Sequence, residues 1–259
     1  MVSLGLLLAV TTVGGFEAIG PLIRAAGDPS PGLLVNRTVG NRPFDPPDPI
    51  RPTVVFIHGL NPFPGQLRFT MAERLSTAIA RKYGPAAFNV LEWDWNAATV
   101  VSVRYPRNVE AAVAQGGRLA EAMRRARLDP TRVYLIGHSN GAIVAASAAR
   151  LIATTQGRLI AQVTFLESAS FNHHVVFERF VAGTCAGRVE NIWAAGPSGF
   201  GREVRIAGVT NHRVDGRTPY LGVVLPTRSG HFDVVRWYID GVNDAASRVG
   251  FNASLLHGR

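Results

Sequence analysis

One serine stands in a motif that could make it a nucleophile, Gly137-His138-Ser139-Asn140-Gly141. The apolar run Val133–Ile136 precedes the motif and the small-residue stretch Ala142–Ala146 follows it. This order predicts a buried strand, a sharp turn and a helix, with the Ser139 hydroxyl projecting from a strained turn. The glycines would let the strand and the helix pass close to each other. A Gly-rich turn with an incidental serine is the alternative, and the flanking strand and helix patterns disfavour it.

A serine hydroxyl needs a base to take its proton, and we expect His231 to be that base. His231 lies in Ser229–Asp233, a turn that leads into a helix predicted over Val234–Arg248. In strand–Gly-x-Ser-x-Gly–helix proteins the histidine is the last of the three catalytic residues along the chain. The other candidates have weaker contexts: His138 is expected to pack, His173 and His174 to be solvated, His212 has no motif around it, and His257 is in a polar tail.

The base in turn needs an acid to orient it, and two carboxylates compete for that role. The loop after the predicted strand Arg188–Trp193 contains no carboxylate, and Glu190 lies inside that strand. Glu167 directly follows the predicted strand next to that of Ser139, so one histidine could reach both residues. We therefore expect Glu167 to be the acid, with Asp215 as the reserve. A salt bridge between Glu167 and an arginine is the structural alternative.

The oxyanion of a tetrahedral intermediate needs two hydrogen-bond donors. The N–H of Asn140, directly after the nucleophile, is expected to be one of them. The N–H of Leu60, which follows His58-Gly59 at the end of another predicted strand, is expected to be the other, with Asn61 as second choice. The His58 ring is expected to hold this turn by hydrogen bonds to loop carbonyls rather than to act in catalysis.

Short apolar runs alternate with helical patterns, which predicts βαβ units and an α/β fold with a mostly parallel sheet covered on both faces. In such sheets ligands bind at the carboxyl ends of the strands, where His58, Asp94, Ser139 and Glu167 are all expected. Besides the elements already named, we predict strands over Thr53–Ile57, Phe88–Trp93 and Leu159–Leu166, and helices over Leu67–Tyr83 and Asn108–Arg127.

Three segments are predicted along the chain. Residues 1–26 are an apolar N-terminal segment with the length of a signal-peptide core, and residues 27–52 are a Pro-rich linker that wraps onto the domain. One α/β domain is expected over residues 53–259. We expect export, or tethering to a membrane through the first segment, and otherwise a cytoplasmic protein. An apolar helix packed on the domain is the alternative.

Composition excludes some function classes. The net charge of +9 comes almost entirely from arginines, which are scattered rather than clustered beside aromatic residues, so we expect no nucleic-acid partner. Cys185 is the single cysteine, which rules out a disulfide framework and a cysteine-based metal site. A serine nucleophile with a histidine base and an acid needs no metal and no cofactor, and we expect none.

These residues resemble the α/β-hydrolase superfamily, and within it the lipase-like serine hydrolases of the pancreatic-lipase type. The resemblance covers roughly residues 53–239 and includes His58-Gly59, the Ser139 motif and Asp94-Trp95, together with Tyr105, Asn108, Gly117 and Leu119. It implies an acid directly after the strand that follows the nucleophile's helix, which is Glu167. The sequence departs from that type in Glu167-Ser168, where aspartate and proline are usual, and in Asn140, where leucine is usual.

The resemblance also implies the activity, which is hydrolysis of carboxylic esters through an acyl-enzyme on Ser139. A small-molecule or lipid ester is the expected substrate, and the short segment 168–187 leaves room for only a minimal lid. Two alternatives stay open: a hydrolase-fold binding protein that has lost its chemistry, and an acyltransferase that uses the same three residues.

Overall fold

The computed structural model describes residues 32–60, 71–95, 105–168, 180–195, 201–215 and 230–243. Residues 1–26, Asn61, His173, His174 and His257 lie outside these ranges. The prediction of export or tethering rests on the first of these segments and stays a prediction. Within the described ranges, no helix combines the length and the apolar character that crossing a membrane requires.

Seven strands of the described residues form one sheet, in which every neighbouring pair is parallel except the pair that contains the edge strand β1. The predicted α/β fold with a mostly parallel sheet is therefore confirmed. Across the sheet the order is β1 (Leu33–Asn36), β3 (Asn89–Asp94), β2 (Thr53–Ile57), β4 (Val133–His138), β5 (Ile160–Leu166), β6 (Ala186–Ala195) and β7 (Val209–Asp215).

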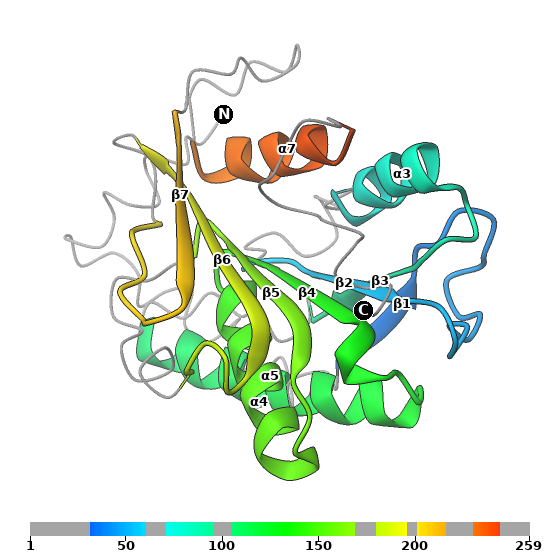
Figure 1. Cartoon of the computed structure of the whole chain (residues 1–259), viewed down its shortest axis with the longest axis horizontal. Coiled ribbons are helices and arrows are strands. Elements are labelled where there is room, and N and C mark those ends of the chain that lie inside the picture. The colour runs from blue at the N-terminus through cyan, green and yellow to red at the C-terminus, as the bar shows by residue number, and fades with distance from the viewer. Residues whose placement is uncertain are drawn as a thin grey trace, which may run out of the picture.

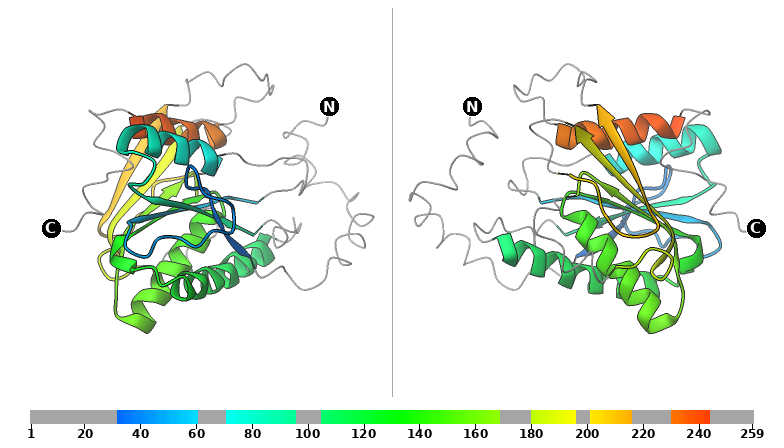
Figure 2. Two further views of the ribbon diagram at one scale, coloured as in Figure 1. Left: turned by 90° about the vertical axis from the view of Figure 1, so that its right-hand side faces the viewer. Right: turned by 60° about the vertical axis from the view of Figure 1, so that its left-hand side comes forward.

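Helices cover both faces of the sheet, as Figures 1 and 2 show. On one face lie α4 (Tyr105–Arg125) and α5 (Gly141–Gln156), and on the other lie α3 (Met71–Tyr83) and α7 (Gly230–Asn243). Side chains alternate along each strand, so each face has its own apolar core: Val55 and Leu135 pack toward α4 and α5, and Val54 and Ile136 toward α3 and α7. A short 3-10 turn, Pro130–Arg132, leads into β4.

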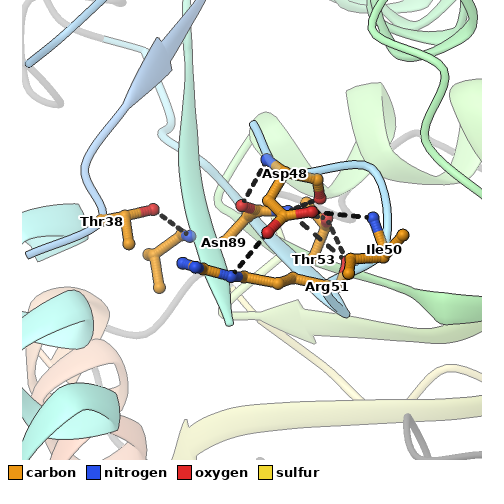
Figure 3. A network of polar contacts seen from close by, with 7 residues as sticks. Thr38, Asp48, Ile50, Arg51, Thr53 and Asn89 are labelled. Atoms are coloured by element: carbon orange, nitrogen blue, oxygen red, sulfur yellow. Dashed lines mark hydrogen bonds and ion pairs between the residues drawn. The ribbon is translucent and has the colours of Figure 1, made fainter. Parts of the chain in front are cut away.

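The Pro-rich segment, predicted as a linker over 27–52, contributes a strand to the sheet. Residues Leu33–Asn36 form β1, antiparallel to β3, and the chain after it is tied to β3 by buried polar contacts (Figure 3). The Asn89 side chain donates to the Asp48 carbonyl at 2.7 Å and accepts from the Asp48 N–H at 3.0 Å. This strand was not predicted, because β1 has only four residues and shows no periodic pattern among the surrounding prolines. It is an edge strand, and an edge strand tolerates prolines at its end.

The strand β7 and the start of the last helix also differ from the prediction. β7 was not predicted, because its sequence Val-Thr-Asn-His-Arg-Val-Asp is mostly polar, as an edge strand with one neighbour allows. The last helix was predicted from Val234, but α7 begins at Gly230. His231 therefore lies in the first turn of α7 and not in a loop before it, which means that a helix packed on the sheet fixes the position of its backbone.

Candidate active site

The turn that carries Ser139 depends on two glycines. A Cβ on Gly141 would lie 2.3 Å from the Ile57 carbonyl oxygen, and one on Gly137 would lie 2.4 Å from the Gly141 carbonyl oxygen. These contacts let α5 start directly behind β4 and beside the end of β2. Ser139 itself has a φ of 56°, a left-handed conformation that costs a non-glycine residue about 1–3 kcal/mol. The surrounding packing holds this strain, and the turn has the geometry predicted for a nucleophile.

Glu167 occupies the equivalent place on the next strand. His138 and Leu166 are register partners at the ends of β4 and β5, so Ser139 and Glu167 each follow directly at the same height of the sheet. The Ser139 N–H donates to the Leu166 carbonyl at 2.9 Å. Glu167 also has a positive φ, of 45°. Both functional candidates therefore sit on strained turns at adjacent strand ends.

The Glu167 carboxylate is completely buried and faces His231, with 3.3 Å between Oε2 and His231 Nδ1. Two backbone donors hold it in place, the Ala194 N–H at 2.7 Å and the Gly201 N–H at 3.1 Å. Burial raises the pKa of this carboxyl, but the hydrogen bonds from His231, Ala194 and Gly201 together lower it more, so the net pKa is below its ordinary value. Glu167 is thus held as a carboxylate toward the imidazole.

The region at the end of β6 contains no carboxylate and instead uses its backbone to hold Glu167. Ala194 within β6 and Gly201 beyond its end each supply one N–H donor to Glu167, and a Cβ on Gly201 would lie 2.6 Å from Glu167 Oε1. A glycine is therefore required for the loop to approach the acid this closely. The alternative of a salt bridge between Glu167 and an arginine does not occur among the described residues. Asp215, the reserve candidate, ends β7, two strands beyond β5.

The second residue of the serine motif, His138, contacts His231 directly. Its Nε2–H donates to the His231 carbonyl at 2.9 Å, and the two ring centroids are 4.5 Å apart. Burial, followed by the nearby His231, holds the pKa of His138 well below its ordinary value. His138 is therefore a neutral donor that fixes the first turn of α7. Packing was predicted for it, but no pattern in the sequence shows that its partner is residue 231.

The loop after β2 brings its backbone against Ser139. A Cβ on Gly59 would lie 2.6 Å from Ser139 Cβ and 3.1 Å from Ser139 Oγ. His58 Nδ1–H donates to the Gly59 carbonyl at 2.7 Å, while His58 Nε2 accepts from the Trp95 N–H at 3.3 Å. The His58 ring thus holds the turn, as its sequence context predicted.

The hydrogen bond from His58 to the Gly59 carbonyl also orients the Leu60 N–H, which is the donor expected for an oxyanion. The Gly59 C=O and the Leu60 N–H belong to one trans peptide and point in opposite directions, so the Leu60 N–H points away from the His58 ring. Within the described residues, neither the Leu60 N–H nor the Asn140 N–H donates a hydrogen bond. Both donors are therefore available to a ligand.

A small cavity joins these parts, with Ser139, His231, Gly59 and Leu60 in its wall. No hydrogen bond between Ser139 Oγ and His231 occurs among the described residues, and both residues line this cavity. Such contacts are often long in the absence of substrate. No group of three or more His, Cys, Asp or Glu side chains that could bind a metal occurs among the described residues.

Three observations identify the fold: the strand order, the strained turn at the end of β4, and the position of Ser139, Glu167 and His231 at one edge of the sheet. The three residues follow one another along the chain in that order. The chain has the α/β-hydrolase fold. Its sequence matches no protein-family model, and no curated protein matches it.

Solved structures similar to this chain include esterases, all at low identity. A hyperthermophilic esterase from the archaeon Pyrobaculum calidifontis is 14% identical, with 94% of this chain and 98% of that chain covered and a TM-score of 0.43. Esterase Est22 is 13% identical, with 94% and 91% covered and a TM-score of 0.42. Carboxyl esterase 2 from Tuber melanosporum is 16% identical, with 83% and 87% covered and a TM-score of 0.41. These values are too low for the activities of the neighbours to be transferred to this chain.

Proposed function

We propose that this protein is a serine hydrolase that cleaves carboxylic esters through an acyl-enzyme on Ser139. One observation carries the proposal: the imidazole of His231 lies 3.3 Å from the buried Glu167 carboxylate and shares a cavity with Ser139, which sits on a strained turn. A buried carboxylate that binds an imidazole beside a serine hydroxyl is the arrangement that activates a serine.

In the proposed reaction, Ser139 Oγ attacks the ester carbonyl carbon while His231 Nε2 takes its proton. Glu167 accepts the hydrogen bond from His231 Nδ1–H and stabilises the imidazolium that forms. The N–H groups of Leu60 and Asn140 bind the oxyanion. The bond to the alcohol then breaks and His231 returns the proton to the departing oxygen. Water, activated by the same imidazole, releases the acid from Ser139.

The hypothesis of a degenerate binding protein rested on the missing carboxylate after the strand that is now β6. The two backbone donors from that region to Glu167 weigh against it, because they support an acid supplied by β5. An acyltransferase would use the same three residues and differ only in the acceptor. Incubation with an ester, in water and with added alcohol, followed by product analysis, separates transfer from hydrolysis.

Labelling with a fluorophosphonate that carries a small ethoxy group tests the proposal. We expect one adduct per chain, on Ser139, because the phosphonate mimics the tetrahedral intermediate and is attacked only by an activated serine. Mass spectrometry of the intact protein and of its peptides would locate the adduct. Ser139→Ala is the control and should not be labelled. A folded wild-type protein that remains unlabelled would contradict the proposal.

His138 offers a prediction about the positioning of the base. A glutamine side chain can place its N–H near the position of His138 Nε2, whereas an asparagine is too short to do so. We expect His138→Gln to keep kcat within about 10-fold of the wild type, and His138→Asn to lower kcat by roughly 10²-fold with little change in KM. The effect arises because the hydrogen bond to the His231 carbonyl is lost in the asparagine variant alone.

Because the pKa of His138 is lowered, the pH dependence of stability also distinguishes the wild type from His138→Gln. The unfolded chain binds a proton at this histidine near its ordinary pKa, while the folded chain does not, so stability falls as the pH drops below about 6.5. His138→Gln should flatten this part of the profile, measured by urea unfolding between pH 7 and pH 5. A profile with an unchanged slope would show that His138 is protonated in the folded state.

A further inference from the structure

The cavity between Ser139 and His231 is small. Its volume is about 20 Å³, which is the space that one or two water-sized groups need. If the acyl chain of an ester bonded to Ser139 Oγ enters this space, its first carbon fills most of the volume. A methyl group therefore fits there, and a longer chain would have to displace the wall.

Apolar side chains close the cavity on the face of the sheet that carries α3 and α7. They are Phe56 from β2, Met71 at the start of α3 and Val235 from α7, and all three are buried. Phe56 and Val235 belong to the core under α3 and α7, so the close packing of that core holds them. Met71 is unbranched and can adapt more easily. Among the described residues that line this cavity there is no carboxylate and no guanidinium.

We propose that this site is specific for acetyl esters, and that Phe56, Met71 and Val235 set the length of the acyl group. The inference rests on the proposed function. Attack by Ser139 Oγ breaks the bond between the acetyl carbonyl carbon and the alcohol oxygen, and the serine proton leaves on the alcohol through His231. Water then cleaves the acetyl-serine to acetate and restores the hydroxyl and its proton.

The p-nitrophenyl esters of acetate, butyrate and octanoate test the proposal with one leaving group. We expect kcat/KM for acetate to exceed that for butyrate by about 10- to 10²-fold, because each methylene beyond the methyl meets a packed wall. The octanoate should be hydrolysed more slowly still. The measurement is initial rate against substrate concentration, with Ser139→Ala as the blank for spontaneous hydrolysis.

Two valines on one helix provide a matched pair of variants. Val235→Ala removes methyl groups from the cavity wall and should raise the butyrate-to-acetate ratio of kcat/KM by about 10-fold. Val242→Ala makes the same change in the same buried core but away from the cavity, and should leave the ratio unchanged. Comparing the two variants cancels the intrinsic reactivity of the esters. If Val235→Ala does not fold, Met71→Ala gives the same test.

The outcomes separate the two proposals. A wild type that prefers butyrate or octanoate, or a wall variant that folds and keeps the wild-type ratio, overturns the acetyl specificity while the serine mechanism stands. A folded protein that hydrolyses none of the three esters and takes no label on Ser139 overturns the proposed function instead.

Discussion

Replacing Ser139 with alanine is expected to lower kcat for ester hydrolysis by roughly 10⁴- to 10⁶-fold, and replacing His231 with alanine by a similar factor. The double variant should be no worse than either single variant, because a base without its nucleophile, or a nucleophile without its base, contributes almost nothing. This lack of additivity is the result that distinguishes a catalytic unit from two independent substrate contacts. Steady-state kinetics on the three variants, with an active-site titration of the wild type, would measure it.

Ser168→Ala is the matched control for the serine. Ser168 follows Glu167 at the same edge of the sheet and is fully buried, and its hydroxyl has no hydrogen-bond partner among the described residues. The same loss of an oxygen should therefore leave kcat within about 3-fold of the wild type. Equal losses in Ser139→Ala and Ser168→Ala would indicate damage to this edge of the sheet rather than removal of a nucleophile.

The Glu167→Gln variant is expected to lower kcat by roughly 10³- to 10⁴-fold while the protein remains folded. The carboxylate accepts from three donors: His231 Nδ1–H, the Ala194 N–H and the Gly201 N–H. An amide can keep only one oxygen for them, so its NH₂ group must face a donor and the imidazole loses its orientation. Asp215→Asn tests the reserve candidate and should leave kcat unchanged, since its strand lies two strands away from β5. A loss in Asp215→Asn with none in Glu167→Gln would reverse the assignment of the acid.

Glu167 should also be visible in the pH dependence of stability. Its folded pKa is below that in the unfolded chain, so its contribution is present above the ordinary glutamate pKa of about 4. This contribution is lost as the pH falls through the lower folded value. The difference in unfolding free energy between wild type and Glu167→Gln should therefore shrink between pH 6 and pH 3, as measured by urea denaturation. A constant difference across that range would mean that the folded pKa is not lowered.

The parts of this site that sequence predicted are those encoded within a few residues. Gly137 and Gly141 are the residues that the close contacts of the turn require. The sequence of β2 is apolar after Thr53, and that of β5 is apolar except for Gln162 and Thr164. Glu167 was predicted because it follows a strand next to that of Ser139. In each case local patterning and global topology agree.

The parts that sequence did not predict depend on tertiary contacts. β1 is short and β7 is mostly polar, because an edge strand has only one neighbour and needs little apolar surface. The contact of His138 with the His231 carbonyl joins residues 93 positions apart, and no spacing rule encodes it. The donors to Glu167 are peptide groups, which every non-proline residue possesses, so residue type could not reveal them.

The use of peptide N–H donors around Glu167 affects how this protein tolerates substitution. Because peptide N–H groups of Ala194 and Gly201 hold the acid, exchanging the Ala194 methyl for another small group leaves its donor in place, and only proline deletes it. An alanine scan would therefore overlook the Ala194 donor. Replacing that single amide with an ester linkage by chemical synthesis would expose its role.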